Sequence, residues 1–133
     1  MEKSDILKAF NNHLSEFIDD LHLTFPESEG IKYSKSGFER LRKVNPKILI
    51  SLFKRYIYDF YLEDINNSNL TKFIEKDYTW DCRKLNPETS EYVKEQIDLL
   101  RVPIKEVSYD EENKKKAIKY MQNFCKLCEI YYS

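Results

Sequence analysis

Two cysteines, Cys125 and Cys128, stand three positions apart near the end of the chain, a spacing that can serve zinc or redox chemistry. Zinc needs four ligands, and the sequence has no second pair of this spacing. A redox pair belongs at the start of a helix, whereas these thiols occupy apolar positions near the end of an expected helix. We therefore expect both thiols to pack in the core, with no metal and no cofactor.

The histidines and carboxylates give little indication of catalysis. A catalytic histidine needs an orienting carboxylate and a nucleophile, and neither His13 nor His22 has both nearby in the sequence. Adjacent carboxylates on a helix point about 100° apart and do not converge on one substrate. The chain contains three such pairs: Asp19-Asp20, Glu63-Asp64 and Glu111-Glu112. We expect no catalytic residues, no enzyme activity and no small-molecule substrate.

Glycine is scarce, with only Gly30 and Gly37 in 133 residues. Phosphate-binding loops and tight hairpins depend on glycine for positive φ or for close backbone approach. We predict that both glycines lie in one polar loop over residues 27–37. Loops that cradle phosphates are therefore not expected.

Charge is unevenly distributed, although the net charge is only −1. Residues 1–30 carry two Lys against seven Asp and Glu, whereas residues 31–56 carry eight Lys and Arg against one Glu. Basic residues interleaved with aromatics can follow a nucleic-acid backbone, but a near-zero net charge favours neutralisation by the acidic first segment or by a protein partner. The candidate contacts to nucleic acid or to an acidic partner are Lys32, Lys35, Arg40, Arg42, Lys43, Lys47, Lys54 and Arg55.

Aromatic residues exceed what one core of this size needs, with ten Tyr and eight Phe. Tyrosine is favoured in protein interfaces. We predict protein-partner contacts at Tyr58, on the polar side of the central helix, and at Tyr131 and Tyr132 near the C-terminus. A short lysine run at 114–116 is typical of solvated surface.

Long amphipathic segments must position these residues. Apolar residues in 4–23 share one face of a helix that Pro26 ends, and residues 46–62 are apolar around most of the circumference, as a central helix is. Asn86-Pro87 predicts the start of a helix that runs to about residue 101 and ends at Pro103. A last helix is predicted over residues 110–131, with short helices over 37–44 and 70–75.

The remaining segments are expected to be irregular. Residues 102–109 have a weak extended pattern, and Trp80 is expected to anchor the stretch 77–80 against the core. The prediction is an all-α, compact single domain over residues 1–133. It has about five helices and an irregular middle connection.

Three cysteines without regular spacing favour a reducing compartment over secretion. The sequence begins with charged residues and lacks both a signal-peptide pattern and a run of about 20 apolar residues. We expect a soluble, intracellular protein without membrane contact.

Four stretches, at 10–26, 45–54, 73–78 and 119–127, occur in an order that resembles a group of small uncharacterised helical proteins encoded by nucleocytoplasmic large DNA viruses. The resemblance implies a virus replicating in a eukaryotic cytoplasm, and a virion or viral-factory component, but no site residues. We expect a non-enzymatic helical interaction module, as a minor structural or accessory protein, that binds a protein partner or self-associates. The alternative is a nucleic-acid-associated accessory factor that uses residues 32–55.

Overall fold

The computed structural model describes residues 2–75 and 85–133, and every regular element within these ranges is helical. The predicted all-α class is therefore confirmed. Helices α3, η1 and α4 follow one another without a break and form one rod, in which η1 is a π-helix. The elements are α1 (Lys3–Thr24), α2 (Glu29–Val44), α3 (Ile48–Phe53), η1 (Lys54–Tyr58), α4 (Asp59–Asn66), α5 (Thr71–Glu75), α7 (Pro87–Val107) and α8 (Glu111–Tyr131).

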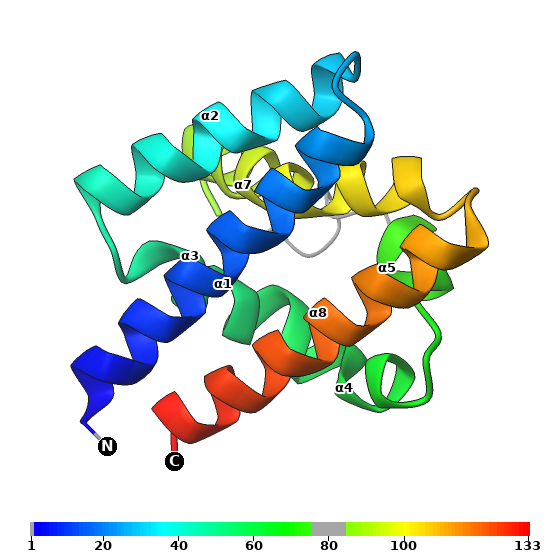
Figure 1. Cartoon of the computed structure of the whole chain (residues 1–133). Helices are drawn as coiled ribbons and strands as arrows, with labels where there is room; N and C mark the ends of the chain where they lie inside the picture. Colours follow the sequence, from blue (N-terminus) through cyan, green and yellow to red (C-terminus); the bar gives the residue numbers. More distant parts are fainter. Residues whose placement is uncertain (1, 76–84) are drawn as a thin grey trace.

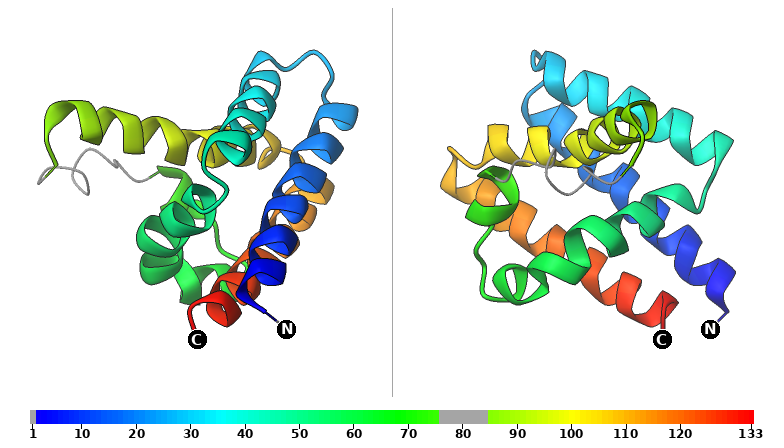
Figure 2. Two further views of the ribbon diagram at one scale, coloured as in Figure 1. Left: turned by 90° about the vertical axis from the view of Figure 1, so that its left-hand side faces the viewer. Right: turned by 180° about the vertical axis from the view of Figure 1, so that it is seen from behind.

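The long helices pack around one shared core (Figure 1). Helix α1 packs against α8 on one side and α2 on the other, and α2 also packs on α7. The α3–η1–α4 rod contacts α8 and reaches both α1 and α7. The two chain ends lie close together in every view, so α1 begins beside the point where α8 ends (Figures 1 and 2).

Aromatic rings from three elements form the centre of the core. Phe10 of α1 lies 5.6 Å from Phe53 of α3 and 5.5 Å from Phe124 of α8, measured between ring centroids. Phe53 and Phe124 are 5.9 Å apart at an interplanar angle of 76°, an edge-to-face contact. This triad explains why the apolar faces of α1 and α8 turn toward the rod.

The predicted loop over residues 27–37 is wrong from Glu29 onward, because helix α2 begins there. Its first turn is capped by Ser28, whose side chain accepts a hydrogen bond from the Ile31 amide at 3.2 Å. Gly30 and Gly37 therefore both lie inside a helix, at a cost of about 1 kcal/mol each relative to alanine. Burial of Ile31 and Phe38 against the neighbouring helices offsets that cost.

The prediction that helix α7 ends at Pro103 is wrong. This helix passes through Pro103 and ends at Val107. Residues 102–107 are helical, so the expected extended segment is wrong there. An interior proline costs about 3 kcal/mol. Ile104 and Val107 are fully buried, and burying such side chains contributes roughly 1.5–3 kcal/mol each. Asn86 caps the helix as predicted, accepting from the Thr89 amide at 2.9 Å.

The central rod starts at Ile48 and continues to Asn66, four residues beyond the predicted end. Asn45 lies just before it and accepts a hydrogen bond from the Lys47 amide at 3.2 Å. The π turn η1 inserts one extra residue into the helical repeat and so changes which side chains share a face. The predicted anchor Trp80 lies outside the described residues.

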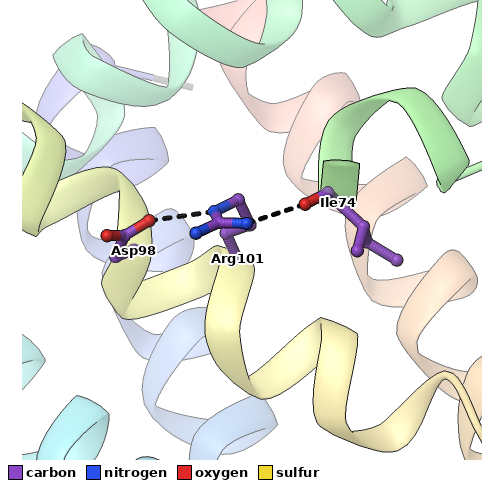
Figure 3. Close-up of polar contacts among 3 residues, drawn as sticks. All are labelled: Ile74, Asp98 and Arg101. Atoms are coloured by element: carbon purple, nitrogen blue, oxygen red, sulfur yellow. Dashed lines mark hydrogen bonds and ion pairs between the residues drawn. The ribbon is translucent and has the colours of Figure 1, made fainter. Parts of the chain in front are cut away.

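The short helix α5 is held to α7 by Arg101 (Figure 3). The Arg101 Nη1 donates to the Ile74 carbonyl at 2.8 Å, and its Nε donates to Asp98 Oδ1 at 2.9 Å. Arg101 thereby joins the carbonyl of a residue in α5 to a carboxylate of α7. None of the helices in the described ranges has the length and apolarity needed to span a membrane.

Candidate interaction surfaces

The acidic first helix lies beside part of the predicted basic set. Lys35 of α2 forms an ion pair with Asp19 of α1, with 3.3 Å between Nζ and Oδ1. Arg42 donates hydrogen bonds to the Ser15 hydroxyl at 3.3 Å and to the Asn12 amide oxygen, both on α1. These contacts use two of the eight basic residues to hold α2 against α1.

The other six are spread over α2, the α2–α3 turn and η1. Lys32 pairs within its own helix with Glu29, at 3.6 Å between Nζ and Oε1. Three exposed residues form no ion pair with any residue in the described ranges, and they gather around the end of α2: Arg40, Lys43 and Lys47. Lys54 and Arg55 lie in η1, where the Arg55 guanidinium sits 5.5 Å from the Tyr56 ring centroid.

The three predicted partner tyrosines are brought together at the end of the molecule where the termini meet. The Lys54 ammonium lies 5.2 Å from the Tyr58 ring centroid and 5.9 Å from that of Tyr132. Tyr131 contacts Tyr132 edge to face at 4.9 Å and carries the Lys3 ammonium 4.9 Å above its own ring. We call Lys3, Lys54, Tyr58, Tyr131 and Tyr132 the terminal tyrosine cluster.

Burial differs within the cluster. Tyr131 is buried and Tyr58 is half-buried at the edge of the core, so neither is freely exposed as the sequence suggested. Tyr132 is 42% exposed, and the neighbouring Ile130 is 53% exposed. The accessible part of the cluster is therefore an apolar and phenolic surface centred on Tyr132.

The π turn aligns Lys54 of this cluster with Asp59. Lys54 and Asp59 are five residues apart, a spacing that aligns in a π-helix but not in an α-helix. Their side chains form an ion pair, and the hydrogen bond that Lys54 donates to the Asp59 carboxylate raises the pKa of Lys54. The sequence prediction assumed an unbroken α-helix over this segment. Residues five positions apart do not align in an α-helix, so the Lys54–Asp59 pair was not expected.

Burial raises the pKa of the Tyr58 phenol. It also raises the pKa of Tyr132, although a hydrogen bond from the Ser51 hydroxyl acts in the opposite direction. At neutral pH Tyr58 and Tyr132 are therefore neutral phenols beside a charged Lys54.

The Cys125 and Cys128 side chains are buried in the core and form no disulfide. Burial is the main cause that raises the pKa of each thiol to about 12. Neither is a thiolate near neutral pH, so both behave as small apolar side chains. No three His, Cys, Asp or Glu side chains in the described part of the chain are grouped to hold a metal ion; Cys82 lies outside that part.

His13 has a carboxylate neighbour that sequence reasoning did not assign. Its Nδ1 lies 3.5 Å from Glu16 Oε2, and its Nε2 lies 3.4 Å from Asn123 Nδ2. The His13 ring packs against Tyr120, with 4.7 Å between centroids. The partners on α8 are more than 100 positions away in the sequence, so no local pattern pointed to this group.

No family model matches the chain, and neither does any curated protein or solved structure.

Proposed function

We propose that this protein is a non-enzymatic helical interaction module that binds a protein partner through the terminal tyrosine cluster. The observation that carries the proposal is the meeting of the chain start, η1 and the chain end, represented by Lys3, Lys54 and Tyr132, on one surface. Tyrosines offer large, rigid, partly apolar contact area at a small cost in side-chain entropy. Tyrosine is one of the residue types enriched at binding hot spots.

The charges in the cluster favour an acidic partner segment with apolar side chains. Lys54 is already paired with Asp59, whereas Lys3 forms no ion pair with a described residue. Lys3 is therefore free to meet a carboxylate, while Tyr132 and Ile130 supply apolar area beside it. The opposing hypothesis is that the cluster only fastens the two chain ends together.

The resemblance to large DNA virus proteins supports a viral context for this module. In that context the protein is a minor virion or accessory component in the host cytoplasm or the viral factory. Nucleic-acid binding along residues 32–55 is the weaker alternative, because Lys35, Arg42 and Lys54 already have partners within the chain.

Photo-crosslinking tests the proposal. A photo-reactive phenylalanine replaces Tyr132 in one variant and Tyr109, which is 84% exposed and outside the cluster, in the other. Crosslinking in lysate of cells that express the protein naturally should give a discrete protein adduct from position 132 and none from position 109. Equal adducts from both positions, or none from position 132, would contradict the proposal.

A further inference from the structure

A pocket of about 210 Å³ lies between α1 and the first half of α8. It is lined by His13, Lys116, Lys119, Tyr120 and Asn123. The first half of α8 is drawn in orange in Figure 1, away from the chain ends that carry the terminal tyrosine cluster. The pocket is thus a separate surface feature that the proposed function does not use.

The inner wall of this pocket is aromatic and held in place from behind. The His13 and Tyr120 rings are 4.7 Å apart at 36°, and Tyr120 is stacked on the buried Phe17 at 4.6 Å and 27°. Glu16 lies 3.5 Å from His13 Nδ1, and burial together with the charge of Glu16 raises the pKa of the Tyr120 phenol. Both rings are therefore fixed before any ligand arrives, which lowers the entropy cost of binding.

The rim of the pocket is cationic. Lys116 and Lys119 are one helical turn apart, both are exposed, and neither forms an ion pair with a residue that the structure describes. Asn123 adds an amide whose Nδ2 is 3.4 Å from His13 Nε2, longer than the usual 2.7–3.2 Å for such a bond. The rim thus has two ammonium groups and one amide available to an anion.

We propose that this pocket binds a nucleoside monophosphate. The heteroaromatic ring packs against His13 and Tyr120, and the phosphate is held by Lys116 and Lys119. The volume is below the roughly 300–1,000 Å³ that encloses a drug-sized ligand, so it suits one ring system and leaves the phosphate at the rim. Glu16, an exposed carboxylate next to His13 Nδ1, repels a phosphate on that side of the His13 ring and so favours its placement at the two lysines.

Proton–nitrogen NMR spectra of the labelled protein test the proposal with three probes: adenosine monophosphate, adenosine and inorganic phosphate. At up to ~5 mM, the monophosphate should shift the amides of His13, Tyr120 and Asn123 at lower concentration than either fragment. Replacing both rim lysines, Lys116→Ala with Lys119→Ala, should weaken monophosphate binding roughly tenfold, since it removes charge-assisted contacts. The matched control, Lys105→Ala with Lys126→Ala, removes two exposed lysines outside the pocket and should leave binding unchanged.

A second variant tests the aromatic wall. His13→Leu keeps the volume but removes one ring, so it should abolish the preference for the monophosphate over inorganic phosphate. The proposal is overturned if phosphate alone binds as well as the monophosphate, or if the shifts centre on another surface. It is also overturned if the rim variant, checked for folding by circular dichroism, binds like the wild type.

Discussion

Gly37 of α2 faces Leu99 of α7 so closely that a β-carbon at position 37 would lie 2.7 Å from Leu99 Cδ2. A contact this short requires either the buried Leu99 side chain or one of the two helices to shift. The absence of a side chain at position 37 therefore permits the close approach of Leu99 to α2.

We predict that Gly37→Ala lowers the free energy of unfolding by about 1 kcal/mol, the centre of a net range of about 0–2 kcal/mol. Overpacking costs roughly 1–3 kcal/mol, and alanine recovers about 1 kcal/mol through its higher helix propensity. Urea unfolding should show a lower midpoint with an unchanged slope.

The matched control is Gly30→Ala in the same helix. A β-carbon there meets Glu106 Oε2 at 3.2 Å, the end of a flexible side chain that can move aside. This variant should be neutral or stabilised by up to ~1 kcal/mol. The packing account is wrong if Gly37→Ala is also neutral, or if its cost persists undiminished in a Leu99→Ala background.

Arg101 gives a second prediction. Arg101→Ala removes the hydrogen bonds to the Ile74 carbonyl and to Asp98, so α5 should open more easily than the rest of the fold. We expect a loss of roughly 1–2 kcal/mol and faster amide hydrogen exchange over residues 71–75.

Arg101→Lys is the informative comparison, because one ammonium cannot reproduce the two-directional contact of a guanidinium. Its exchange over residues 71–75 should resemble that of Arg101→Ala more than that of the wild type. Wild-type exchange in both variants would show that Arg101 does not hold α5.

The buried thiols give a third prediction, on pH dependence. The folded state keeps the protons of Cys125 and Cys128 up to about pH 12, whereas an unfolded thiol loses its proton near pH 9. The stabilisation from this difference is complete below pH 9 and is lost as the pH rises from 9 to 12. Unfolding free energies measured across that range should fall with pH.

The control is the pair of substitutions Cys125→Ala and Cys128→Ala, with Cys82→Ser in both proteins so that only the core thiols differ. Each alanine should cost about 1 kcal/mol through lost apolar contact, but the decline above pH 9 should be shallower. A thiol reagent at pH 8 should label the core cysteines only after unfolding. Rapid labelling of the folded protein would contradict their burial.

The sequence predicted those parts of the fold in which local signals agree with tertiary packing. The apolar face of α1 and the Asn86 cap of α7 are local patterns, and both were found as expected. The predicted short helix over 37–44 is the second half of α2. The first half was missed because residues 27–37 were interpreted as a polar loop, although Ser28 caps a helix there and Ile31 is buried. Pro103 was likewise interpreted as a helix end. The helix continues because the residues after Pro103 are buried, and that burial is not visible in a local sequence pattern.

The candidate surfaces were only partly predictable. Tyrosine excess suggested Tyr58, Tyr131 and Tyr132, but their meeting around Lys54 depends on the π turn and on the proximity of the chain ends. The pocket at His13 depends on α1 and α8 lying side by side, which no spacing in the sequence encodes.

The most direct test of the central claim is the dissociation constant for the partner that crosslinks at position 132. The account predicts that Tyr58→Ala with Tyr132→Ala weakens this complex by roughly 30-fold or more, as expected for a hot spot worth about 2 kcal/mol. Tyr33→Ala with Tyr109→Ala, at two exposed tyrosines outside the cluster, should change it less than about twofold. Equal affinities for the two double variants would contradict a binding role for the terminal tyrosine cluster.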